Sequence, residues 1–308
     1  MKTPQVPEQP AGEPPHRRGR PPESICESAG AAHRTWLEPV RSRLVASGLT
    51  LDDLVSRSGY SKARLSELLR GKGYYPGWEI TYSVVRALEI PVGPLCRLWK
   101  VAAVEADKTP AWIKNRIRDV QFEQEEQPVA HLGLTQAMWQ PYTAYAQVFL
   151  QSEQRARQAT AETFDVLWLT WDQATTSPNT PLHAWQLLRT TVLSRTPKRP
   201  GGHPDIRAAA FSTTGQADIH DLGERLARID LQARFFDAIS HLPADQMDIT
   251  VLRYLCGITP DVIPGVIGLS PAITHTLDHH ARGALNDLFP DTGTGTGTDI
   301  DADTDTQE

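Results

Sequence analysis

The chain has 308 residues, of which 40% are hydrophobic and 22% are charged, and its formal net charge is −6 at pH 7. This composition is that of a globular protein with two or three modest cores. We find no apolar run of the roughly 18–20 residues that a transmembrane helix needs and no signal-peptide segment. Three scattered cysteines argue against a disulfide framework or a cysteine metal site. We therefore expect a cytoplasmic protein with no membrane partner.

The net charge conceals an uneven distribution along the chain. Residues 31–100 carry 11 Lys and Arg against 6 Asp and Glu, for a net charge of +5. Residues 201–290 carry 6 against 11, for a net charge of −5, and residues 291–308 carry six acids and no base. The overall negative charge therefore does not exclude a nucleic-acid partner for the basic front of the chain.

The apolar residues recur at helical spacing almost throughout the interior, and no segment alternates convincingly as a strand. The Pro-, Gly- and Glu-rich arm and the repetitive polar tail lack the apolar residues that stabilise a fold, so we expect both to be disordered. The prediction is an all-α fold. Its parts are a disordered arm at 1–30, a five-helix domain at 31–105, a linker at 106–131, a helical domain at 132–196, a linker at 197–217, a second helical domain at 218–289 and a disordered tail at 290–308.

The front domain contains the pattern of a helix-turn-helix. Thr50 can cap a helix, with Asp53 at the capping-box position, and Gly59 can end that helix in a left-handed conformation. Ser61 then caps a helix over 62–70, and Gly71 ends it. Two short helices joined by a tight Gly-containing turn are typical of this motif. We expect Leu65, Leu68 and Leu69 to point into the core.

The outward residues of the second helix are therefore candidates for contact with DNA. Its N-terminal turn would enter the major groove first. There Lys62 or Arg64 can donate to guanine, Ala63 can touch a thymine methyl group and Glu67 can accept from cytosine. Three further cations, Arg43, Arg70 and Lys72, are better placed for phosphates. The predicted DNA-contacting set is Arg43, Thr50, Ser61, Lys62, Ala63, Arg64, Ser66, Glu67, Arg70 and Lys72.

This stretch resembles the phage-repressor (Cro-type, xenobiotic-response-element-like) helix-turn-helix family. The departures are Val55, where the family has Ala, and an insertion of Tyr74-Tyr75. The resemblance implies specific binding to duplex DNA, and a homodimer that reads two half-sites. The matching positions are Arg41/Arg43, Gly48-Leu49-Thr50, Leu54-Val55, Gly59, Ser61, Leu65/Leu68, Arg70-Gly71, Pro76 and Ile80.

The back of the chain resembles extracytoplasmic-function sigma factors. The residues similar to the second conserved region of that family are Ala161-Glu162, Leu169/Trp171, Ala184-Trp185 and Arg189/Arg195. Those similar to the fourth region are Leu242-Pro243, Val251-Leu252, Gly257, Gly268-Leu269-Ser270, Ala281-Arg282 and Leu285. The resemblance implies two domains, 132–196 and 218–289, that hold core RNA polymerase and read promoter DNA.

Within the fourth-region-like part we expect a second helix-turn-helix. Thr259 would cap its first helix, Gly268 would make the turn, and Ser270-Pro271 would start the next helix. In that helix Ile273 and Leu277 would point inward. Pro264 would strain an early turn of the first helix.

The second hairpin departs from the family where the family contacts DNA. The matching places hold His275, Leu277 and His280, and only Arg282 remains basic. Losing several phosphate-directed cations costs nonspecific affinity. We therefore expect a sigma-like shape with weak DNA binding of its own, and we keep His275 and Arg282 as secondary DNA-binding candidates.

Three further motifs give weaker signals. Arg17-Arg18-Gly19-Arg20-Pro21 resembles an AT-hook, which makes Arg18, Gly19 and Arg20 secondary candidates, although a solvated basic run is the favoured interpretation. His275 and His279 have the spacing of a zinc pair, but no carboxylate or thiol accompanies them, so no metal site is predicted. The sequence offers no phosphate loop and no catalytic set, so we expect neither a cofactor nor an enzyme.

The sequence therefore predicts a transcriptional regulator that reads duplex DNA with the helix 62–70 and is associated with the nucleoid when bound. Its sigma-like half would contact core RNA polymerase, another regulator or a second copy. Two alternatives remain open. One is a working alternative sigma factor, and the other is a sigma-mimicking interaction module without strong DNA binding.

Overall fold

A computed structural model describes residues 23–118, 120, 125–206 and 222–288. Within these residues the chain is helical, and the single extended pairing is the isolated antiparallel bridge between Lys198 and Pro204. The predicted all-α class is therefore confirmed. Every helix in the described ranges is too short or too polar to span a membrane. The predicted disorder of 1–22 and 290–308 lies outside the described residues, as do Arg18, Gly19 and Arg20.

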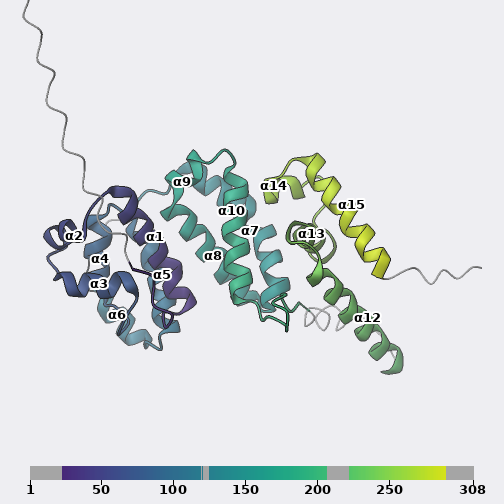
Figure 1. Ribbon diagram of the computed structural model, residues 1–308, viewed down its shortest axis with the longest axis horizontal. Helices are drawn as coiled ribbons and strands as arrows, with labels where there is room; N and C mark the ends of the chain where they lie inside the picture. Colours follow the sequence, from purple (N-terminus) through teal and green to yellow (C-terminus); the bar gives the residue numbers. More distant parts are fainter. Residues whose placement is uncertain (1–22, 119, 121–124, 207–221, 289–308) are drawn as a thin grey trace, which may run out of the picture. The chain divides into compact units, whose positions relative to one another are not determined.

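The chain divides into two compact units, whose helices are labelled in Figure 1. Unit 1 comprises Met1–Trp139 and Gln158–Arg195, and unit 2 comprises Gln140–Arg157 and Thr196–Glu308. The helices of unit 1 are α1 (Ala31–Ser47), α2 (Leu51–Ser58), α3 (Lys62–Arg70), α4 (Trp78–Ala87), α5 (Val92–Glu105), α6 (Pro110–Arg118), the first part of α7 (Val129–Leu150), most of α8 (Glu153–Leu169), α9 (Trp171–Thr176) and α10 (Thr180–Arg195). Unit 2 holds the remainder of α7 and α8, then α12 (Leu222–His241), α13 (Ala244–Thr250), the π-helical turn η1 (Val251–Leu255), α14 (Ile263–Ile267) and α15 (Pro271–Leu288).

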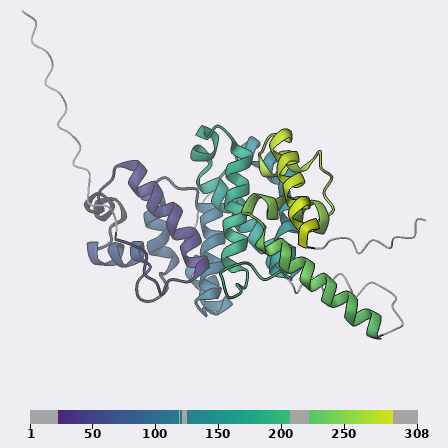
Figure 2. The ribbon, with the colours of Figure 1, turned by 45° about the vertical axis from the view of Figure 1, so that its right-hand side comes forward.

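The core of the front bundle is built on three tryptophans. Trp36 of α1, Trp78 of α4 and Trp99 of α5 are fully buried, and α1 and α5 lie side by side in both views (Figures 1 and 2). The N-cap residue of α1 is Gly30, which has no side chain that could accept from the free N–H groups of the first turn. Glu105 at the end of α5 accepts from the N–H of Ala32 at 3.0 Å and of His33 at 3.2 Å. A carboxylate at a helix N-terminus satisfies these donors and interacts favourably with the helix dipole, so this contact stabilises the packing of α1 on α5.

The predicted linker 106–131 is wrong over 110–118, where α6 forms. Trp112, Ile113 and Ile117 of α6 pack against the front core. The Trp112 ring stacks on Trp99 with centroids 5.7 Å apart and an interplanar angle of 19°. Three half-buried apolar side chains on one face hold this short basic helix on the bundle, and aromatic stacking adds to the apolar area that they bury.

The last residues of the predicted disordered arm, 23–30, are also part of the bundle. The N–H of Cys26 donates to the Arg70 carbonyl at 2.8 Å, and the Arg34 guanidinium donates to the Cys26 carbonyl at 2.6 Å. Ile25 packs against the core. These hydrogen bonds and this contact repay the entropy of ordering the segment, which the low apolar content of the arm did not predict.

The predicted division between 31–105 and 132–196 is not a boundary between compact units. Arg97 of α5 forms a bidentate pair with Asp165 of α8, with Nη2–Oδ1 at 2.6 Å and Nε–Oδ2 at 3.2 Å. Burial raises the pKa of Asp165 to about 6, although Arg97 opposes the shift. Val166 and Leu169 of α8 pack against the front core. Helix α8 therefore joins the front bundle.

Two residues of the second-region resemblance come together inside unit 1. Glu162 of α8 is buried and pairs with Arg195 at the end of α10. A buried carboxylate with a guanidinium partner fastens these helices to each other. In unit 2, the buried Tyr145 hydroxyl donates to Asp248 at 2.7 Å, which connects α7 to α13.

Candidate nucleic-acid interface

The N-terminus of α2 has the predicted capping box. The Thr50 hydroxyl accepts from the Asp53 N–H at 3.2 Å, and the Asp53 carboxylate accepts from the Thr50 N–H at 2.7 Å. The Thr50 hydroxyl also donates to the Asp53 carboxylate at 2.7 Å, and this bond, together with the one from the Thr50 N–H, lowers the pKa of Asp53. Reciprocal satisfaction of two free donors fixes where the helix begins.

The turn into α3 also follows the prediction. Gly59 is left-handed with φ 75°, a conformation that a side chain would strain, and its N–H donates to the Val55 carbonyl at 3.0 Å. Ser61 then caps α3 by accepting from the Arg64 N–H at 3.5 Å. The α2–α3 hairpin, residues 50–71, therefore has the geometry of a helix-turn-helix.

Helix α3 divides into the two faces that were predicted. Leu65, Leu68 and Leu69 are buried in the core. The outward residues differ in their exposure to solvent. Lys62, Ala63, Arg64 and Glu67 are exposed, whereas Ser66 and Arg70 are half-buried.

The cations of the predicted contact set are not equally available. Arg64 and Lys72 are exposed, and no side-chain hydrogen bond or ion pair to either is found in the described part of the chain. Lys62 holds Asp52 of α2 at 2.8 Å in an exposed pair. Such a pair contributes little to stability, so Lys62 can exchange its partner for a phosphate or a base.

Arg43 and Arg70 are instead committed to the fold. Arg43 donates to the Leu88 carbonyl at 3.3 Å and lies 3.8 Å from Asp172. Arg70 pairs with Glu23 at 2.9 Å and donates to the Ser66 carbonyl at 3.3 Å. Their predicted role in phosphate binding is therefore less favoured than that of Arg64 and Lys72.

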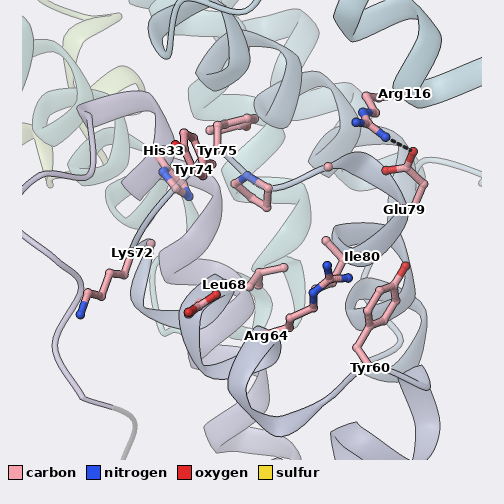
Figure 3. A pocket seen from close by; sticks show the side chains of 14 residues that line it. His33, Tyr60, Arg64, Leu68, Lys72, Tyr74, Tyr75, Glu79, Ile80 and Arg116 are labelled. Atoms are coloured by element: carbon pink, nitrogen blue, oxygen red, sulfur yellow. Dashed lines mark hydrogen bonds and ion pairs between the residues drawn. The ribbon is translucent and has the colours of Figure 1, made fainter.

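Beside the exposed face of α3 lies a groove of about 540 Å³ (Figure 3). Three cations around it come from separate segments: Arg64 from α3, Lys72 from the loop that follows, and Arg116 from α6. Arg116 donates to Glu79 of α4 at 3.2 Å. The other residues that line the groove are His33, Tyr60, Glu67, Leu68, Gly71, Tyr74, Tyr75, Pro76, Gly77 and Ile80.

Sequence reasoning did not assign Tyr74 and Arg116 to this surface. Of the inserted pair, Tyr75 is buried and its hydroxyl donates to the Trp99 carbonyl at 2.7 Å, whereas Tyr74 is 97% exposed. Arg116 was assigned to a linker. Its spacing of four residues from Trp112 is the signal that could have placed it on a packed helix.

His33 lines the groove and is neutral near pH 7. Burial lowers its pKa to about 4, although Glu105 opposes the shift. Its ring stacks on Trp36 with centroids 5.1 Å apart. Because it carries no charge near pH 7, it adds no cation to the groove.

The second hairpin, α14–α15, differs from the sequence prediction in two ways. Residues 259–262 form a hydrogen-bonded turn, and α14 begins at Ile263 without a side-chain cap, so Thr259 does not start the helix. Pro264 lies in the first turn of α14, where its missing N–H is not needed, so it does not strain the helix. Gly268 is left-handed, and α15 begins at Pro271 as predicted.

The buried face of α15 was also assigned wrongly. The residues that point inward are Thr274, Asp278, Ala281 and Leu285, whereas Ile273 is 50% exposed. Leu277 is half-buried. A pattern search that counts only apolar residues misses a face on which Thr and Asp are buried with partners.

Asp278 forms ion pairs with two nearby arginines. Arg253 of η1 pairs with it, and Arg282 lies 3.2 Å away on the next turn of α15. His275, His279 and His280 are exposed. Arg282, a secondary DNA-binding candidate, is therefore engaged within the fold, and His275 is accessible.

No protein-family model, curated protein or solved structure matches the chain. The resemblances of the two hairpins therefore depend on their motifs and geometry alone. Within the described ranges, no group of three or more His, Cys, Asp or Glu side chains is placed to hold a metal ion.

Proposed function

We propose that this protein is a transcriptional regulator that binds specific duplex DNA through its α2–α3 hairpin. The observation that carries the proposal is the exposed N-terminal half of α3, where Lys62, Ala63 and Arg64 are open while the leucines of the opposite face anchor the helix. In a helix-turn-helix, this end of the second helix enters the major groove.

The chemistry of these side chains suits base edges. Arg64 has free donors for the O6 and N7 of guanine, and Lys62 can join it after leaving Asp52. Ala63 presents a methyl group to thymine, and Glu67 presents an acceptor to cytosine. Lys72, in the loop after α3, is placed to contact the flanking phosphates.

A working sigma factor is the less favoured alternative. Its promoter-reading helix would be α15, whose arginine is engaged by Asp278 and whose exposed face offers histidines and Ile273. A basic face is needed to neutralise phosphates. Contact of the sigma-like half with polymerase, another regulator or a second copy stays a prediction.

The test uses the full-length protein and a library of duplexes with 20 random base pairs. After several rounds of selection, binding to the enriched duplex and to a scrambled duplex is compared by fluorescence anisotropy at about 0.1 M salt. We expect the enriched site to bind about 1,000-fold tighter or more. Equal binding to the two duplexes would contradict the proposal.

A transcription assay separates the regulator from the sigma factor. The enriched duplex is placed upstream of a reporter gene and incubated with core RNA polymerase, with and without a housekeeping sigma factor. A regulator changes transcription only when the housekeeping factor is present. Initiation with core polymerase and this protein alone would support the sigma-factor alternative instead.

A further inference from the structure

Helix α6 is an additional basic element on the front bundle. It carries three cations, Lys114, Arg116 and Arg118, and no acid, and a fourth cation, Lys108, lies in the preceding loop next to Asp107. Basic residues concentrated on one short helix beside a DNA-reading motif are typical of a phosphate-binding surface.

Packing fixes where α6 places these charges. Trp112 stacks on Trp99, and Tyr75 approaches its edge with centroids 6.5 Å apart. The Lys108 ammonium and the Arg116 guanidinium lie over the Trp112 ring, 5.8 and 5.5 Å from its centroid. Arg116 therefore belongs to a packed aromatic cluster and not to a linker.

This cluster brings Arg116 to the groove that Arg64 and Lys72 also line (Figure 3). The Arg116 side chain is 49% exposed, and its pair with Glu79 uses one of the five guanidinium donors. The charge of Glu79 is neutralised by Arg116. Of the remaining charged residues around the groove, Arg64 and Lys72 are positive and Glu67 is negative. The groove is therefore open, net basic and lined with polar side chains.

We propose that α6 is a second phosphate-binding element, and that one DNA backbone runs along this groove between Arg116 and the α3 side. This inference depends on the proposed function, and it adds a contact outside the helix-turn-helix. A groove of about 540 Å³ exceeds what a single ion needs, and three cations from separate segments suit a chain of phosphates. The exposed Tyr74 can donate its hydroxyl to the same backbone.

The experiment measures affinity of the full-length protein for the enriched duplex between 0.05 and 0.3 M salt. Arg116→Gln is expected to reduce the slope of log K against log salt by about 0.9 and to weaken binding about five- to tenfold at 0.1 M. Arg116→Lys is expected to keep the wild-type slope, because it keeps the charge. Arg86→Gln is the matched control, since it removes an exposed arginine from the last turn of α4, whereas the first turn lines the groove.

Glu79→Gln supplies a second, opposite readout. Releasing Arg116 from Glu79 is expected to tighten binding about two- to threefold in the wild type and to have no effect on top of Arg116→Gln. Partial unfolding of a variant lowers the active fraction but leaves the salt slope unchanged, so the slope separates a phosphate contact from a structural role.

The outcomes distinguish the two proposals. If the wild type does not discriminate the enriched duplex from the scrambled one, the proposed function fails and this inference fails with it. If the wild type discriminates but Arg116→Gln keeps the wild-type slope, or Arg86→Gln lowers it equally, only the role of α6 is overturned.

Discussion

The α2–α3 and α14–α15 hairpins share an outline and differ in where their charges lie. In the first, leucines occupy the buried face of α3, and Lys62 and Arg64 are exposed. In the second, a carboxylate occupies the buried face of α15, and Asp278 draws Arg253 and Arg282 toward it. The same hairpin can therefore present its cations to a polyanion or use them to hold itself together.

The largest expected effect tests that difference directly. Lys62→Ala combined with Arg64→Ala is expected to weaken binding to the enriched duplex about 100-fold or more, since each good base contact discriminates by about 1–3 kcal/mol. Arg282→Ala is expected to change affinity less than about twofold, because that arginine pairs with Asp278 within the fold. Anisotropy at 0.1 M salt measures both.

Comparable losses from the two changes would contradict the ranking of the hairpins. Thermal unfolding followed by circular dichroism provides the control, because both changes in α3 lie on its exposed face and should leave the unfolding midpoint near the wild-type value.

The next effect is on stability and belongs to the second hairpin. Asp278→Asn leaves the partly buried Arg253 without its carboxylate and is expected to cost about 2–3 kcal/mol, discounted from the figure for a fully buried pair. Hydrogen exchange of α13 and α15 measures the loss. Asp287→Asn, an exposed acid on α15, is the control and should stay within about 0.5 kcal/mol. DNA affinity that fell with Asp278→Asn would mean that the second hairpin contributes to the interface.

The first hairpin could be predicted from the sequence because each local signal agrees with its packing. Thr50, Gly59 and Ser61 supply caps and a turn whose requirements are local, and the leucines of α3 supply an unmixed apolar face. When local and tertiary preferences coincide, the pattern determines both the bounds of a helix and its buried side.

The second hairpin and α6 could not be predicted in the same way, because their positions depend on partners distant in sequence. Asp278 is buried because Arg253 reaches it, and Trp112 is ordered because Trp99 lies under it. The wrong face of α15 and the missed helix at 110–118 have this common cause. Neither the exposure of Tyr74 nor the position of Arg116 at the groove could be inferred before Tyr75 and Trp112 were placed.

A pH titration tests the buried histidine of the front bundle. Burial lowers the pKa of His33 from 6.5 to about 4. Between these two pH values the histidine is therefore protonated in the unfolded chain and neutral in the folded bundle. The stabilisation is complete above pH 6.5 and is lost as the pH falls toward 4. The free energy of unfolding should decrease by about 2 kcal/mol between pH 6.5 and 5 from this group.

Chemical denaturation at several pH values measures that decrease in the wild type and in His33→Phe, which keeps an aromatic ring against Trp36. The variant should show a shallower dependence. What remains comes from His131, whose pKa burial also lowers, and from Asp165, whose raised pKa acts in the opposite direction. An unchanged profile in His33→Phe would show that the histidine is not held neutral by the fold.

One exposed acid from each hairpin provides the last prediction, a small change in DNA affinity. Asp52→Asn releases Lys62 from its 2.8 Å pair and removes a negative charge beside the proposed DNA-reading helix, so it should tighten binding about two- to threefold. Asp261→Asn removes an exposed acid from the start of the second hairpin, with the same change in net charge, and should leave affinity unchanged. Anisotropy with the enriched duplex at 0.05 and 0.2 M salt compares them. If both variants tightened binding equally, the gain would come from net charge alone and Lys62 would have no special position; a gain confined to Asp52→Asn, and larger at the lower salt, places the DNA against α2 and α3.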